Sequence, residues 1–199
     1  MLRIAVSVEG ATEREFISQI LAPHFCEFNI SVQPVDMRGN VSLDKIKDEL
    51  RCLIYNFDFT TTLYDFYGFK NREHRNVTEL EKDILELIPS ERKSRLIPYI
   101  QQYEFEALLF SAPDIMAEYF NLTDRADYFH SVLKNCGGAE NIDDGYDTCP
   151  HRRISKVFPG FNKKFHVPDL CKIIGLKTIR AACPRFNCWI KKLESIAFK

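Results

Sequence analysis

Carboxylate side chains follow three of the segments that the sequence predicts to be β-strands, and these acids are Glu9, Asp65, Glu104 and Glu106. The carboxyl ends of parallel strands meet at one edge of a sheet, where α/β proteins bind their ligands. Carboxylates gathered there repel one another unless a cation neutralises them, and oxygen ligands suit a hard divalent ion. The pattern therefore predicts a Mg²⁺ (or Mn²⁺) site in a metal-dependent enzyme.

Each of these four acids can also be given a purely structural role. Burial beside other acids would raise the pKa of Glu9 and suit it to general acid–base chemistry, whereas the turn at Gly10 alone would leave it on the surface. Asp65 is the strongest single candidate for a metal ligand, and its alternative role is to cap the following turn. If Glu104 and Glu106 lie in extended backbone they share one face, whereas in a helix they diverge. We expect both to line the site, with Glu104 nearer the metal.

A helix is predicted just after this first turn, and acids in its opening residues bear on the site. Thr12 and Glu15 have the spacing of a capping box, so Glu15 is expected to be the capping partner. Glu13 lies in the first turn, where the helix dipole stabilises a carboxylate. Glu13 is therefore expected either to serve the helix or to line the site.

The elements that must position these acids alternate between strand and helix. Alternating apolar and β-branched residues predict the strands, and apolar residues at helical spacing predict the helices between them. This order requires a parallel sheet with helical crossovers. Pro98, inside the fourth strand, indicates an edge position or a bulge. The strands are expected at residues 2–8, 29–37, 59–64 and 95–103, and the helices begin at Thr12 and Ser42 and span 77–88.

Beyond Glu104 the pattern becomes helical, apart from an irregular stretch over residues 135–150 that is rich in Gly, Asp and Asn. We predict an α/β core over residues 1–110 and a mostly helical extension over 111–199 that packs on this core. Helices are expected over residues 105–110, 114–120, 124–134, 168–174, 176–182 and 184–196.

Charge is distributed unevenly along a chain whose net charge is only −1. Residues 150–199 contain 12 Lys or Arg and two Asp or Glu, a net charge of +10, which leaves −11 for residues 1–149. A basic segment of this kind favours nucleic acid as a partner. Its alternative role is to pack on the acidic body. Arg153 and Lys164 are the candidate phosphate contacts, because arginine suits bidentate binding and both lie in a strongly basic stretch.

Composition narrows the class of protein further. The 199-residue chain is 45% hydrophobic, which is ordinary for one globular domain, and no apolar run approaches the ~20 residues of a membrane span. The start runs straight into a strand pattern, so no signal peptide is expected. The seven cysteines are scattered, contain no Cys-x-x-Cys pair and match no zinc-site spacing. We therefore expect a cytoplasmic protein that has no membrane partner.

With these motifs assembled, the chain resembles a bacterial family of unknown function, domain family 4276, which is Toprim-like. The resemblance runs from Arg3 to about Leu193. The matching segments are Val8-Glu9-Gly10-x-Thr12-Glu13, Asp65-Phe66-Tyr67-Gly68, Ile97-Pro98-Tyr99-Ile100-Gln101, Glu104-Phe105-Glu106-Ala107-Leu108-Leu109-Phe110, Pro150-x-x-Arg153-Ile154 and Cys183-Pro184-x-Phe186-x-x-Trp189.

Toprim domains are catalytic modules of topoisomerases, primases and nucleases, and the resemblance implies a parallel-sheet core with Mg²⁺ chemistry. It implies that Glu9 is the general acid–base and that Asp65 is the first aspartate of a metal-binding Asp-x-Asp. The second aspartate position is Tyr67 here, so Glu104 or Glu106 would supply the missing ligand. A histidine that usually precedes the Glu-Phe-Glu is Tyr103. The resemblance also implies an ATPase partner in a setting of phage defence.

Three functions are compatible with these features. The first is a Mg²⁺-dependent nuclease that hydrolyses phosphodiesters of DNA or RNA, with the basic C-terminal segment following the backbone. The second is a non-catalytic Toprim-like module that binds an ATPase partner or nucleic acid, which the tyrosine at position 67 favours. The third is a receiver domain with Asp65 as phosphate acceptor, which would leave Glu104 and Glu106 without a role.

Overall fold

Alternating apolar residues in the N-terminal half build a parallel sheet, as the sequence predicts. The computed structural model describes residues 1–39, 41–70, 74–143 and 145–198, and five strands within them form one sheet in the order β2-β1-β3-β4, with β5 also pairing with β3. Every pairing is parallel. The strands are β1 (Leu2–Val8), β2 (Ile30–Asp36), β3 (Phe59–Asp65), β4 (Leu96–Ile97) and β5 (Ile100–Gln101).

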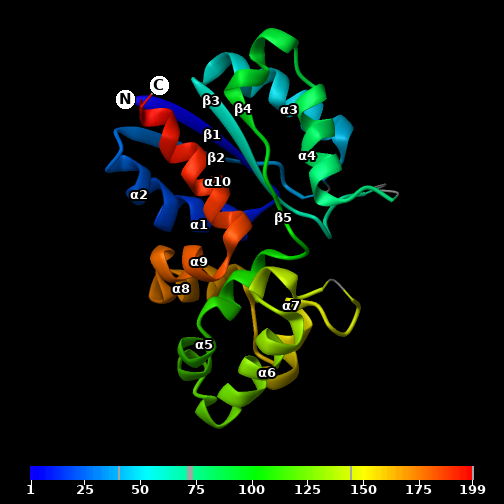
Figure 1. Cartoon of the computed structure of the whole chain (residues 1–199), viewed down its shortest axis with the longest axis vertical. Helices are drawn as coiled ribbons and strands as arrows, with labels where there is room; N and C mark the ends of the chain where they lie inside the picture. Colours follow the sequence, from blue (N-terminus) through cyan, green and yellow to red (C-terminus); the bar gives the residue numbers. More distant parts are fainter. Residues whose placement is uncertain (40, 71–73, 144, 199) are drawn as a thin grey trace.

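The two faces of the sheet bury separate apolar clusters. Ile4 of β1 belongs to a cluster with Phe16 and Trp189, whereas Tyr64 of β3 belongs to a second cluster with Ile46. Because successive strand residues point to opposite faces, alternation of period two supplies both clusters. Figure 1 shows α1, α2 and α10 on one side of the sheet and α3 and α4 on the other. These helices are α1 (Ala11–Phe16), continued through the π-helical segment Ile17–Leu21 by α2 (Ala22–Cys26), α3 (Leu43–Asn56), α4 (Val77–Glu86) and α10 (Pro184–Glu194).

The start of α1 differs from the predicted one. The capping box expected at Thr12 and Glu15 is wrong, because extended backbone at Gly10 lets the helix begin at Ala11. The third helical residue is therefore Glu13, whose carboxylate accepts a hydrogen bond of 3.1 Å from the backbone N–H of Gly10. An acid expected at or near the site thus also holds the start of the helix.

The fourth predicted strand lies at an edge of the sheet and is interrupted at Pro98, which divides it into β4 and β5. Thr62 of β3 bridges the interruption: its hydroxyl accepts from the backbone N–H of Tyr99 at 2.9 Å and donates to the Tyr99 carbonyl at 2.8 Å. The Tyr99 ring stacks on Trp189 of α10, with ring centres 4.6 Å apart. The Thr62 hydroxyl and the stacked Tyr99 ring therefore hold the chain where Pro98 prevents strand pairing.

The region beyond Glu104 is helical, as predicted, with two differences. Helix α7 lies where no helix was expected, and α8 begins at Lys163 rather than at residue 168. Pro168 lies inside α8, where burial of Val167 and Leu170 outweighs the loss of one backbone donor. The elements are the 3₁₀ segment η3 (Phe105–Ser111), α5 (Pro113–Tyr119), η4 (Thr123–Arg125), α6 (Ala126–Cys136), η5 (Ala139–Asn141), α7 (Pro150–Val157), α8 (Lys163–Ile174), α9 (Leu176–Ala182) and η6 (Ser195–Phe198); η2 (Ser90–Arg95) precedes β4.

The helical region packs on the sheet through a shared apolar core. Phe105, Val167 and Phe186 lie in the same buried cluster as Ile4 of β1. Helices α5, α6 and α7 extend away from the sheet, while α10 returns along it (Figure 1). In the described part of the chain, no helix has the length and apolar character needed to cross a membrane.

Candidate active site

The strand order creates a switch point between β1 and β3. From β1 the chain moves to β2 on one side, and from β2 it crosses to β3 on the other side. Doubly wound α/β proteins bind ligands in the crevice that opens at such a point, beside the carboxyl ends of the strands. Glu9 directly follows β1 and Asp65 ends β3. The topology therefore brings both acids to this crevice.

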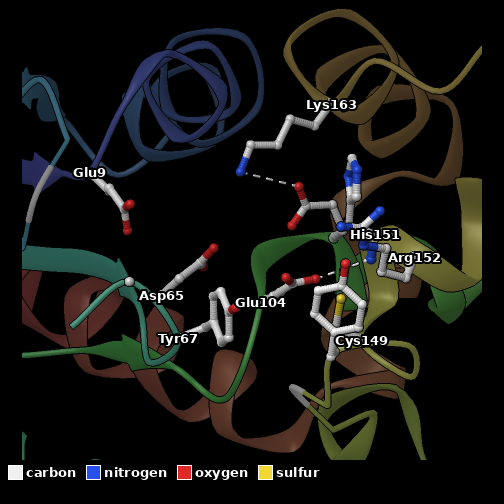
Figure 2. A pocket seen from close by; sticks show the side chains of 11 residues that line it. Glu9, Asp65, Tyr67, Glu104, Cys149, His151, Arg152 and Lys163 are labelled. Carbon is white, nitrogen blue, oxygen red and sulfur yellow. Dashed lines mark hydrogen bonds and ion pairs between the residues drawn. The ribbon is translucent and has the colours of Figure 1, made fainter. Parts of the chain in front are cut away.

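A cavity of about 500 Å³ opens here, between the sheet edge and helices α7 and α8 (Figure 2). This volume is within the range of small-molecule sites. The four acids predicted as catalytic residues and metal ligands, Glu9, Asp65, Glu104 and Glu106, all line it. The remaining lining residues are Tyr67, Gly68, Tyr146, Cys149, His151, Arg152 and Lys163.

Glu9 packs directly against the turn that follows β3. A Cβ atom at position 68 would overlap Oε2 of Glu9, so glycine is needed for the carboxylate to lie where it does. Burial raises the pKa of Glu9 above its ordinary value, while Lys163 and a backbone hydrogen bond from Asp65 oppose this shift. Among the described residues, Oε2 of Glu9 has no hydrogen-bond partner. A buried carboxyl group with a raised pKa holds a proton more readily than a surface glutamate, which suits it to general acid–base chemistry.

Asp65 is a buried acid at the sheet edge of the cavity. The residue is 7% exposed, and its Oδ1 atom has no hydrogen-bond partner in the described part of the chain. Burial raises the pKa of Asp65 well above the ordinary value, and the negative charges of Glu13, Glu106 and Glu9 raise it further. Such an arrangement is costly for stability and is typical of functional sites.

Glu104 and Glu106 both reach the cavity, although a helix begins between them. Glu104 remains in extended backbone and caps η3, and its Oε2 accepts from the backbone N–H of His151 at 3.1 Å. Burial raises the pKa of Glu104, and the charge of Glu106 adds to this. Oε1 of Glu106 lies 3.5 Å from Nζ of Lys163. The sheet edge is thus tied to α7 by one acid and to α8 by the other.

Lys163 supplies the positive charge nearest these acids, and the sequence analysis did not select it. Its ammonium group points to the carboxylates from the first turn of α8 (Figure 2). The carboxylate of Glu106, followed by those of Asp65, Glu13 and Glu9, raises the pKa of Lys163, so it stays charged. The signal that could have identified it is Asn162, which caps α8 by accepting from the Lys164 N–H at 3.1 Å and so sets the first helical residue.

Glu13 lines a second cavity, of about 340 Å³, that shares Glu9 and Lys163 with the first. Burial raises the pKa of Glu13 to about 7, and the charges of Glu106 and Glu9 act in the same direction. Glu13 therefore both serves the helix start and lines the edge of the site, so the two roles expected for it coexist.

Arg153 and Lys164, the two predicted phosphate contacts, lie outside the cavity, and the residue before each of them lines it instead. The Arg153 side chain donates to the Thr148 carbonyl, and the ammonium of Lys164 lies 5.9 Å from the centre of the Phe165 ring. Arg152 and Lys163 line the cavity instead. Consecutive helical residues point about 100° apart, so of two neighbouring basic residues only one faces the cavity.

The donor atoms of the cavity fit a hard divalent cation in kind, since they are carboxylate oxygens and, among the described residues, three of them are buried without hydrogen-bond partners. Their spacing is wider than that of a closed metal site: within residues 1–39, 41–70, 74–143 and 145–198, no three His, Cys, Asp or Glu side chains are grouped to hold an ion. The ion pair between Lys163 and Glu106 occupies part of the same region. A cation could therefore be bound only after these side chains draw together.

A thiol nucleophile does not suit this cavity. Burial raises the pKa of Cys149 to about 11, and the carboxylate of Glu104 raises it further. The reactive form of cysteine is the thiolate, and a thiol with a pKa this high forms little thiolate at neutral pH. Nucleophilic chemistry by this cysteine is therefore not expected at the cavity.

A family model described as "Domain of unknown function (DUF4276)" matches residues 8–194. No curated protein and no solved structure matches the chain.

Proposed function

We propose that this chain, which belongs to the family of domain of unknown function 4276, is a divalent-metal-dependent phosphodiesterase that acts on nucleic acid. The observation that carries the proposal is the convergence of Glu9, Asp65, Glu104 and Glu106 on one cavity at the switch point of a parallel sheet. Buried acids with raised pKa values, opposed by one lysine, are typical of catalytic sites and unfavourable for stability alone. A Toprim-like role for the sheet agrees with this arrangement.

Mg²⁺ or Mn²⁺ would be held by Asp65 and by Glu104 or Glu106, which leaves Glu9, also predicted as a ligand, free to exchange a proton. The chemistry of the ion would be to polarise the phosphate and offset its charge. Release of Lys163 from Glu106 would let these carboxylates move closer to the ion. Lys163 would then be free to pair with a phosphate oxygen.

Glu9 is the proposed general acid–base. In phosphodiester hydrolysis, water adds to phosphorus, the bond to one bridging oxygen breaks, and that oxygen takes up a proton. Burial raises the pKa of Glu9 above its ordinary value, so its carboxyl group takes up a proton from water more readily than a surface glutamate and can pass one to the departing oxygen. The contact with Gly68 holds this carboxyl group in place while it does so.

Cleavage of labelled DNA and RNA, single- and double-stranded, tests the proposal. The wild type is expected to cleave at least one of them with Mg²⁺ or Mn²⁺ and none with a chelator. Asp65→Asn should abolish cleavage, whereas Asp48→Asn, at an exposed site on α3, should leave it unchanged. The absence of cleavage by the wild type, with and without its partner ATPase, would overturn the proposal.

A second candidate is a non-catalytic module that binds nucleic acid or an ATPase. It is favoured by the wide spacing of the carboxylates and by Tyr67, which stands where a Toprim domain has its second aspartate. Calorimetry separates the two candidates. Mg²⁺ or Mn²⁺ should bind the wild type and fail to bind Asp65→Ala, and equal binding by both proteins would favour the module.

We also propose where in the cell the protein acts and with which partner. All seven cysteines are free, which suits a reducing compartment, so we place the protein in the cytoplasm. An ATPase partner and a role in phage defence follow from the family resemblance. Copurification of an ATPase with the tagged chain from its native cells would support the partner.

A further inference from the structure

Two tyrosines stand at the cavity with most of their surface in solvent. Tyr67 is 54% exposed and Tyr146 is 77% exposed, and both line the same cavity as the catalytic acids. Large aromatic side chains usually bury their rings, because each buries 150–250 Å² when it is packed. Two exposed rings beside a single polar cavity therefore form a feature that the packing of the fold does not require.

The backbone that carries Tyr67 is firmly held. Its N–H donates to the Tyr103 carbonyl at 3.1 Å, and the turn is closed by a 3.0 Å hydrogen bond from Gly68 N–H to the Asp65 carbonyl. The same turn carries Asp65, so the backbone places Tyr67 beside the acidic centre (Figure 2). A turn that is already ordered loses little conformational freedom when a ligand binds to its side chain.

Tyr146 is associated with a cation. The guanidinium of Arg152, on the first turn of α7, lies 5.1 Å from the centre of the Tyr146 ring. An arginine in this position supports the ring and offers a positive charge to a neighbouring phosphate. Lys163 offers a second positive charge on the acidic side of the cavity. The lining of the cavity thus combines aromatic rings with cations, which is the pattern of sites for single-stranded nucleic acid.

We infer that Tyr67 and Tyr146 form a stacking subsite for an unpaired nucleobase, so that the substrate is single-stranded or locally unpaired nucleic acid. This inference rests on the proposed phosphodiesterase function and specifies its substrate class. A base inside a duplex has both faces covered by its neighbours, so it cannot stack on a tyrosine unless it leaves the helix. The phosphate beside the stacked base lies between Arg152 and Lys163, next to the acidic centre.

The chain offers a matched control for each tyrosine. Tyr55 on α3 is 58% exposed and has the guanidinium of Arg92 4.8 Å from its ring centre, but it does not line the cavity. A test of Tyr67→Ala, Tyr146→Ala and Tyr55→Ala therefore compares tyrosines of similar exposure, two of them at the cavity. Tyr67→Phe and Tyr146→Phe keep the ring and remove the hydroxyl group.

Binding is measured by fluorescence anisotropy with Mg²⁺ present, in a Glu9→Gln background that slows cleavage of the bound strand. The probes are a labelled thymidine oligonucleotide, its duplex with an adenosine strand, and an abasic strand of the same length. Tyr67→Ala and Tyr146→Ala should each weaken binding of the thymidine strand by roughly 5- to 150-fold. Tyr55→Ala and the two Phe variants should bind it like the parent protein, and no tyrosine variant should alter binding of the abasic strand.

Three results would overturn the inference. They are equal losses on the thymidine and abasic strands, tighter binding of the duplex than of the single strand by the parent protein, and no binding of any probe. Cleavage assays on the same tyrosine variants, made with Glu9 intact, separate this inference from the proposed function. Metal-dependent cleavage that does not depend on the tyrosines overturns the subsite and leaves the phosphodiesterase. Tyrosine-dependent binding without any cleavage supports the subsite and leaves a binding module.

Discussion

The two walls of the cavity are built in different ways. The sheet wall carries buried carboxylates, among them Asp65 and Glu106, on strand ends and on the 3₁₀ segment that follows β5. The helical wall carries Arg152 and Lys163 on the first turns of α7 and α8, and the side chain of Lys163 remains 53% exposed. The acids are buried at a cost in stability, whereas Arg152 and Lys163 are exposed. We therefore expect chemistry from the sheet wall and adaptable charge from the helical wall.

The largest effect is expected from removing a titrating carboxyl group from the sheet wall without changing the shape of that wall. Glu9→Gln keeps the size of the side chain and removes its titrating group, so turnover should fall by roughly 10²–10⁴-fold, the usual effect of losing a general acid or base. Steady-state cleavage kinetics measure this, and circular dichroism checks the fold. Activity within a few-fold of the wild type in a folded variant would exclude Glu9 from catalysis.

A second change moves the same carboxylate without removing it. Gly68→Ala places a Cβ atom where Oε2 of Glu9 lies, so the acid must shift, and displacements of this kind cost up to about 100-fold in turnover. Gly160→Ala is the control, because its Cβ atom would meet the Phe158 ring at 3.4 Å, an ordinary contact. Equal activity of the two variants would show that the position of Glu9 does not limit the reaction.

The helical wall is tested through salt dependence. Each phosphate contact contributes about 0.7–0.9 to the slope of log K against log salt concentration, so Arg152→Ala with Lys163→Ala should flatten the slope by about 1.4–1.8. The pair Arg153→Ala with Lys164→Ala, which the sequence favoured, should change it less, because neither side chain lines the cavity. A larger effect of the second pair would place the nucleic acid on a different surface.

The smallest expected effect is a change in the pH dependence of stability. Burial raises the pKa of Glu13 from 4.5 to about 7, so the folded protein holds this proton more tightly than the unfolded chain does. The resulting stability is complete below pH 4.5 and is lost as the pH rises through 7. It amounts to at most about 3 kcal/mol.

Glu13→Gln should therefore make the free energy of unfolding fall less between pH 5 and pH 8, as measured by urea denaturation. Glu15→Gln, at a more exposed position of the same helix, is the control. The charges that face Glu13 are Lys163, Glu106 and Glu9, and they are unchanged in both variants. The same pH dependence in Glu13→Gln and in the wild type would contradict the burial of a titrating carboxyl group.

The sequence by itself determined the sheet and the acids at its edge. Alternation of period two predicts strands, and the helices between them require these strands to be parallel. The carboxyl ends of parallel strands share one edge whatever their order in the sheet. Glu9, Asp65, Glu104 and Glu106 could therefore be assigned to one site without knowledge of the strand order. A shift of one or two residues in a strand boundary does not move an acid away from this edge.

Only the tertiary structure decided which cations and which aromatic rings face these acids. On a helix the direction of a side chain turns by about 100° per residue, so the choice between Lys163 and Lys164 depends on where α8 begins. That start is set by the Asn162 cap and by the burial of residues such as Val167 against the sheet. Sequence patterns locate helix ends only to within one or two residues, which is too coarse to assign one face.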